Sequence, residues 1–175
     1  DADRGMCKFF EDKCTRLKPY SGVEGHVDEV LTFMPYGLDN FKIWVYQPVF
    51  EENVSDQMRE LIISNFDYNR TKLEDRLGAD KIVYFPTLFN KNGFISNPPL
   101  FNRLSLKKNN SYLFVFPKQT DELQALIEQE ITVIRQNLPE FTINTNYIDT
   151  ISTHQMSGFG NSIGGNLHCI VKQVV

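Results

Sequence analysis

The chain has 175 residues, of which 41% are hydrophobic and 13% aromatic, enough for a substantial core within one domain. Its 18 basic and 22 acidic residues give a net charge of −4 without a basic block, which argues against nucleic-acid binding. No stretch is long and apolar enough to cross a bilayer, so we expect no membrane span. The sequence indicates no particular compartment.

The first predicted elements form a hairpin. A strand rich in β-branched and aromatic residues is expected over 27–33, ended by Pro35-Tyr36-Gly37. Polar and apolar residues alternate over 41–46 before Pro48, which predicts a second strand. The two strands would pair across a turn at 36–40.

Helical patterns then alternate with strands. A helix is predicted to begin at the cap residue Ser55 and to run through position 62, with a shorter helix over 72–77. Residues 81–85 predict a third strand, closed by Pro86, and 90–102 is typical of a loop.

The second half repeats this alternation without a clear sequence repeat. We expect a strand over 112–116, a helix through Asn137 capped by Thr120 or Asp121, and strands over 141–144 and 167–171. A polar, glycine-rich loop is expected over 152–165. The strand–helix rhythm predicts an α/β fold. The helix is expected to bury one apolar stripe, formed by Leu123, Leu126, Ile127, Ile131 and Ile134.

Two segments at opposite ends of the chain carry the candidate chemistry. Gly25-His26-Val27-Asp28-Glu29 supplies an imidazole and a carboxylate two residues apart. Gly164-Gly165-Asn166-Leu167-His168-Cys169 supplies a thiol after a glycine pair. His26 and Asp28 alternate on the predicted strand, so we expect both side chains to face the same side. A thiol, a proton-transfer group and a carboxylate suit attack on a planar cationic carbon such as that of a guanidinium.

The segment 25–35 resembles the histidine motif of the protein-arginine deiminases, and 164–173 resembles the nucleophile strand of their superfamily. Segments 82–89 and 113–118 are similar to the strands that precede the last helix in that family. The resemblance covers roughly residues 22–173. It implies the fold of the guanidine-modifying, or pentein, superfamily, a five-bladed ββαβ propeller, here partial or shortened. Residues 1–21 would be an extension or a remnant of preceding blades, and 22–175 a deiminase-like catalytic domain.

The resemblance also implies roles for three residues. Cys169 matches the nucleophile that forms a covalent thiouronium intermediate, and His26 matches the residue that transfers protons. Asp28 matches a carboxylate that binds the substrate guanidinium. The implied reaction is hydrolysis of arginine residues in a protein or peptide to citrulline and ammonia. Within the superfamily, the Val-Asp-Glu form of the histidine motif favours protein-arginine deimination.

The chain departs from the family pattern upstream of His26. The family has a second substrate-binding carboxylate there, but Asp1, Asp3, Glu11 and Asp12 lie in no matching motif. The calcium ligands of the animal enzymes also lie mostly upstream, so calcium is implied by the family while its ligands have no match in this chain. The residues themselves identify no cofactor or metal site.

Other interpretations stay open. The missing carboxylate is compatible with a catalytically incomplete domain that binds guanidine compounds or arginine peptides, and free guanidine compounds could be the substrate of an active enzyme. A cysteine protease would leave Asp28 without a natural purpose. Cys7 and Cys14 form a disulfide or remain two structural thiols. We assign no catalytic role to Glu29, His154 or His168.

Overall fold

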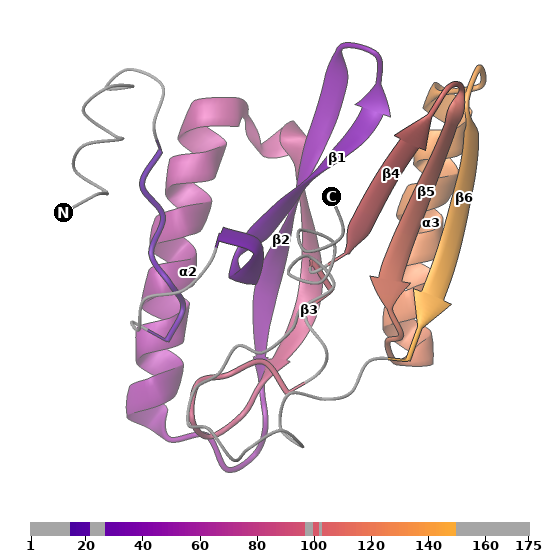
Figure 1. Ribbon diagram of the computed structural model, residues 1–175. Helices are drawn as coiled ribbons and strands as arrows, with labels where there is room; N and C mark the ends of the chain where they lie inside the picture. Colours follow the sequence, from indigo (N-terminus) through magenta and orange to yellow (C-terminus); the bar gives the residue numbers. More distant parts are fainter. Residues whose placement is uncertain (1–14, 22–26, 97–99, 102, 150–175) are drawn as a thin grey trace, which may run out of the picture.

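The computed structural model describes residues 15–21, 27–96, 100–101 and 103–149. Its first unit contains the strands β1 (Leu31–Gly37), β2 (Asn40–Phe50) and β3 (Ile82–Phe89), with helix α2 (Asp56–Leu77) between β2 and β3. A 3₁₀ turn, η2 (Ala79–Lys81), leads into β3. The sheet order is β1-β2-β3: β1 is antiparallel to β2, and β3 is parallel to it (Figure 1).

The second unit has the same order of elements. Strands β4 (Leu104–Lys108) and β5 (Ser111–Pro117) form an antiparallel hairpin, helix α3 (Asp121–Asn137) follows, and β6 (Thr142–Ile148) returns parallel to β5. Each unit is therefore a ββαβ arrangement in which the second strand lies at the centre of the sheet. The predicted α/β character is confirmed. The topology repeats although the sequence shows no clear repeat.

Helix α3 joins the two units. It packs against β6 of its own sheet and also against β1 and β3 of the first sheet, whereas α2 packs against β2 (Figure 1). The apolar stripe predicted for α3 is buried at Leu123, Ile127, Ile131 and Ile134. The prediction that Leu126 belongs to the buried stripe is wrong, because Leu126 is 37% exposed. The buried positions follow spacings of three and four residues, and Leu126 lies at the margin of that stripe.

Aromatic rings fill the space between the sheets. Trp44 is fully buried, with its ring centroid 4.6 Å from that of Phe85 and 6.1 Å from that of Phe116 in the second unit. Tyr46 stacks on Phe101, with centroids 3.8 Å apart. Rings of this size bury large apolar areas, so this cluster is a main source of the cohesion between the units.

The predicted hairpin of the first unit is confirmed, but the prediction that Pro35-Tyr36-Gly37 ends its first strand is wrong, because all three residues belong to β1. Its turn is Leu38-Asp39, closed by the pair Gly37 and Asn40. The prediction that Pro48 ends the second strand is wrong, because β2 continues to Phe50. The β1–β2 ladder begins at Leu31 opposite Val45, so Pro48 lies where β2 pairs with β3 alone. A residue without an N–H is tolerated where one side of a strand is unpaired.

Helix α2 is continuous, which corrects the prediction of two separate helices. Buried Asn65 and Asn69 interrupt its apolar pattern, but their side chains bind the segment that precedes the first unit. The Nδ2 of Asn69 donates to the Lys18 carbonyl at 2.8 Å, and its Oδ1 accepts from the Lys18 N–H at 2.7 Å. The Nδ2 of Asn65 donates to the carbonyls of Pro19 and Tyr20, each at 3.1 Å. Asparagine is a poor helix former, but these tertiary hydrogen bonds stabilise both asparagines within the helix.

Strand β4 was not predicted. It is a short edge strand whose last four residues are all exposed, ending in two lysines. Such a strand has no buried face to give an alternating pattern, and charged residues are typical of sheet edges. Helix α3 begins as predicted, with the Thr120 side chain accepting from the Leu123 N–H. The predicted strand over 167–171 lies outside the described residues.

Candidate active site

The three predicted site residues are placed unequally by the structure. His26 and Cys169 lie outside the described residues, and Asp28 is placed by its backbone alone. The proposed meeting of thiol, imidazole and carboxylate therefore stays a prediction. Of the predicted site, the structure describes only the segment that carries Asp28.

That segment is a 3₁₀ turn, η1 (Val27–Glu29), rather than the beginning of a strand. The prediction of a strand over 27–33 is wrong in its first half, since β1 begins at Leu31. The Val30 N–H donates to the Val27 carbonyl at 3.0 Å, which closes the turn. Val27 is 64% exposed, so its β-branched side chain gains no burial that would hold it in a sheet. Strand alternation consequently cannot be used to place Asp28 relative to His26.

The turn is tied directly to the sheet. The Tyr46 N–H donates to the Val30 carbonyl at 3.1 Å, and Val30 and Leu31 are both buried. Only Glu29 separates Asp28 from this anchored pair. The backbone position of Asp28 is therefore set by how the start of β1 is held.

Arg103, which sequence analysis did not single out, holds that part of β1. Its Nη1 donates to the Thr32 Oγ1 at 2.5 Å, and its Nη2 donates to the Phe33 carbonyl. It lies directly before β4, at the end of a segment predicted only as a loop. No periodicity or motif in the sequence could indicate this long-range contact.

A second polar link joins the units farther along β1. The buried Tyr36 hydroxyl donates to the Glu130 carboxylate on α3 and accepts a hydrogen bond of 2.9 Å from the Trp44 Nε1. Burial, and then the hydrogen bond to Glu130, raises the pKa of Tyr36. This tyrosine is thus held as a protonated hydrogen-bond donor, a structural role rather than a catalytic one.

On the surface of the second unit, Glu128 of α3 receives three hydrogen bonds. Its donors are the Tyr147 hydroxyl at 2.8 Å, the Thr145 hydroxyl at 2.9 Å and the Arg135 guanidinium at 3.3 Å. Burial would raise the pKa of Glu128, but these three bonds outweigh it and hold the pKa below its usual value of 4.5. An ionised carboxylate held by donors on α3 and β6 serves to fix the helix on its sheet.

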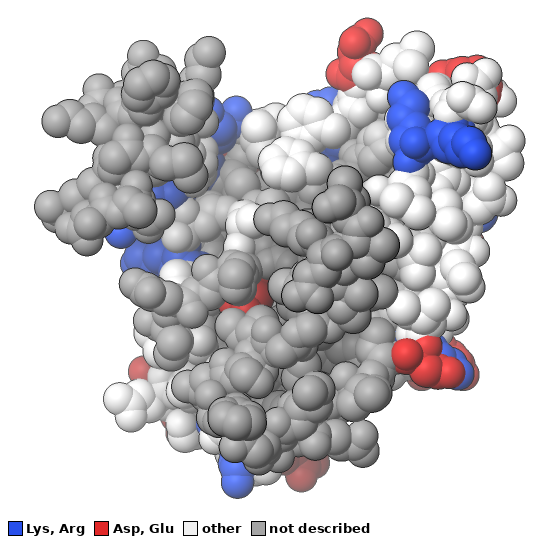
Figure 2. All heavy atoms as spheres, in the orientation of Figure 1, with Lys and Arg blue, Asp and Glu red and all other residues white. Residues whose placement is uncertain are grey.

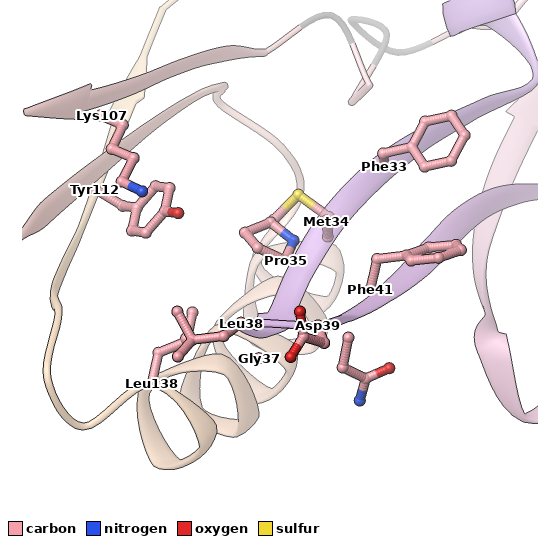
Figure 3. Close-up of a pocket in the computed structure, with 11 residues that line it drawn as sticks. Phe33, Met34, Pro35, Gly37, Leu38, Asp39, Phe41, Lys107, Tyr112 and Leu138 are labelled. Atoms are coloured by element: carbon pink, nitrogen blue, oxygen red, sulfur yellow. The ribbon is translucent and has the colours of Figure 1, made fainter.

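A cavity of about 480 Å³ opens between the β1–β2 turn and the second sheet. Figure 3 shows Phe33 and Phe41 on the hairpin side, and Lys107 and Tyr112 on the side of β4 and β5. Its lining on β1 extends from Phe33 to Gly37. None of the described residues that line the cavity carries a thiol or an imidazole.

No cluster of three or more His, Cys, Asp and Glu side chains in the described part of the chain is arranged to hold a metal ion. Neither α2 nor α3 is long and apolar enough to cross a membrane. On the face shown in Figure 2, acidic and basic side chains of the described residues lie in small separate groups.

Comparison with known proteins adds no family assignment. No protein-family model matches the sequence, and no curated protein matches it significantly. The two end motifs, and the way the described residues support the first of them, are therefore the basis for a proposed function.

Proposed function

We propose that this chain is the catalytic part of a protein-arginine deiminase-like hydrolase, with the architecture of a partial or shortened pentein propeller. The observation that carries the proposal is the combination of the Gly-His-Val-Asp-Glu segment, directly before a ββαβ unit, with a Gly-Gly-Asn-Leu-His-Cys segment near the end of the sequence. Two successive ββαβ units support the architecture, because that unit is what the resemblance implies.

The reaction proceeds in two stages. The Cys169 thiolate attacks the guanidinium carbon of an arginine side chain, forming a C–S bond. The C–N bond to one terminal nitrogen then breaks, and His26 supplies the proton with which that nitrogen leaves as ammonia. Water, deprotonated by His26, attacks the resulting thiouronium carbon, and the C–S bond breaks to release citrulline and the thiolate. The second proton of the water passes to solvent, where the released ammonia takes it up as ammonium. Asp28 accepts hydrogen bonds from the guanidinium and orients it for attack.

The experiment is a citrulline assay on an arginine peptide, run with calcium and with a chelator. Cys169→Ala is expected to abolish citrulline, and His26→Gln to lower kcat by about 10²- to 10⁴-fold. Cys14→Ala and His154→Gln are the matched controls, since they change the same residue types outside the two motifs. They are expected to keep the wild-type rate. Free arginine as a second substrate separates peptide from free-guanidine specificity.

A second candidate is a domain that binds arginine peptides without turning them over. The specific observation in its favour is that no acidic residue upstream of His26 lies in a motif matching the family's second substrate-binding carboxylate. Peptide binding that is weakened by Asp28→Asn, with no citrulline from wild type, would establish this candidate. Peptide cleavage without citrulline would instead indicate a cysteine protease and would exclude both.

A further inference from the structure

Arg103 forms an unusual contact between the two ββαβ units. β1 and β4 are edge strands of different sheets, so no backbone ladder joins them. The guanidinium of Arg103 bridges this gap by donating to two consecutive residues of β1, to the Thr32 hydroxyl and to the Phe33 carbonyl. Because a guanidinium is a rigid planar fork, the two bonds together fix both the position and the direction of the strand at that point.

The charge of Arg103 is not used in an ion pair within the described part of the chain. Both of its acceptors are neutral oxygens, its shielded Nε has no acceptor there, and its guanidinium lies 5.9 Å from the Phe114 ring centroid. Burial lowers the pKa of Arg103 to about 10, which leaves it charged at neutral pH. Within the described residues, the hydrogen bonds of this guanidinium are therefore made to β1 and not to a carboxylate.

The contact lies close to the segment that carries Asp28. Thr32 is separated from the η1 turn by Val30 and Leu31, and both are buried and held against β2. A shift of β1 at Thr32 therefore moves η1 with it, since no flexible linker lies between them. In a reaction that needs the guanidinium aligned for attack, a displacement of about 1 Å can cost about 100-fold in rate.

We infer that Arg103 is a positioning residue for the proposed deimination, which fixes the start of β1 and so places Asp28 against the substrate guanidinium. The inference rests on the proposed function. Arg103 acts through Thr32 and Phe33 and does not itself touch substrate.

The test compares kinetics and local backbone exchange in one set of variants. Arg103→Gln removes the donor, and Thr32→Val the acceptor, of the same hydrogen bond. Thr32→Ser keeps the hydroxyl acceptor. Arg70→Gln is the control. Arg70 is a surface arginine whose loss changes the net charge equally, and its contacts lie on α2. We expect Arg103→Gln and Thr32→Val to lower kcat on an arginine peptide by about 10- to 100-fold, with a smaller change in KM. Thr32→Ser and Arg70→Gln are expected to stay within about two-fold of wild type.

Amide hydrogen exchange provides a reading that does not depend on turnover. In Arg103→Gln, exchange is expected to accelerate in peptides that cover 27–36 and to stay unchanged in those that cover β6. The inference is overturned if wild type makes citrulline while Arg103→Gln keeps kcat within two-fold. It is equally overturned if exchange accelerates throughout the chain, because Arg103 is then a general stabiliser. If wild type makes no citrulline, the proposed function fails, and the role of Arg103 in catalysis fails with it. Localised exchange would then leave only the structural contact established.

Discussion

Tyr36→Phe tests whether the two ββαβ units form one cooperative structure. The substitution keeps the ring, which is 2% exposed, and removes only the hydroxyl. That hydroxyl joins β1 to α3, because it donates to Glu130 and accepts from Trp44. The change therefore cuts a polar link between the units while leaving the packing of the aromatic cluster in place.

The expected loss follows from the two hydrogen bonds. A bond to a charged acceptor contributes about 1.5–3 kcal/mol, and a buried donor left without an acceptor costs about 1–3 kcal/mol. Trp44 is fully buried, so its Nε1 cannot turn to water, whereas the half-buried Glu130 can be partly rehydrated. We therefore expect the free energy of unfolding to fall by about 3 kcal/mol. At about 2–4 °C per kcal/mol for a chain of this size, Tm would fall by about 6–12 °C.

Urea unfolding can be followed by tryptophan fluorescence, because Trp44 is the single tryptophan of the chain and belongs to this link. Tyr112→Phe is the matched control. Tyr112 is half-buried, and its hydroxyl makes no hydrogen bond within the described residues, so removing it is expected to change stability by less than about 0.5 kcal/mol. A Tyr36→Phe protein as stable as Tyr112→Phe would refute the reasoning. So would two separate transitions in wild type.

Three further predictions concern the helices and one glycine. Ile131→Ala should destabilise the fold by about 3–4 kcal/mol in urea, because Ile131 is fully buried on α3, whereas Leu126→Ala, at a position 37% exposed, should cost less than about 1 kcal/mol. Equal losses would show that α3 does not bury the face described. Glu128→Gln should lower stability at neutral pH by about 1 kcal/mol. Because the folded state depresses the pKa of Glu128, its contribution is present above pH 4.5 and is lost as pH falls through the lower folded value. Wild type and variant should therefore converge in acid-unfolding curves, and a constant difference down to the acid limit would contradict the assignment. Gly93→Ala should cost about 1–3 kcal/mol, because Gly93 has a φ of +77° and a Cβ there would lie 2.8 Å from the Met58 Sδ. Gly37→Ala, where a Cβ would meet Asn40 at 3.3 Å, should cost clearly less in the same thermal melt.

Local sequence signals predicted the elements whose faces are buried. The hairpin of the first unit and helix α3 were expected because alternation and helical spacing record which side of an element meets the core. Ser55 and Thr120 were recognised as cap residues, and both side chains accept a hydrogen bond from the first turn of their helices. These features depend on neighbours in sequence, so the sequence carries them directly.

The features that were missed depend on distant parts of the chain. The continuity of α2 was not predicted because Asn65 and Asn69 interrupt its apolar pattern. Their hydrogen bonds are made to residues more than 40 positions away, so the local sequence does not show them. β4 has too little burial to leave a pattern. The η1 turn takes the place of the first half of a predicted strand, since the β1–β2 ladder begins only at Leu31. For the site, the motif resemblance predicts roles for His26, Asp28 and Cys169, whereas the contact of Arg103 with β1 is visible only in the tertiary structure.

The repeated topology gives these contacts a common explanation. In each unit a short segment leads into the first strand: η1 and Val30 precede β1, and Leu100, Phe101 and Arg103 precede β4. The two leading segments lie near each other, because Arg103 of the second segment donates a hydrogen bond to Thr32, near the beginning of β1. Phe101 likewise stacks on Tyr46, whose N–H holds the Val30 carbonyl. The segment bearing Asp28 is therefore supported by its counterpart in the next unit. A catalytic residue at the start of one ββαβ unit would thus be positioned by the unit that follows it, which is why Arg103→Gln and Tyr36→Phe should have different effects. The first is expected to act on the site and the second on the stability of the whole.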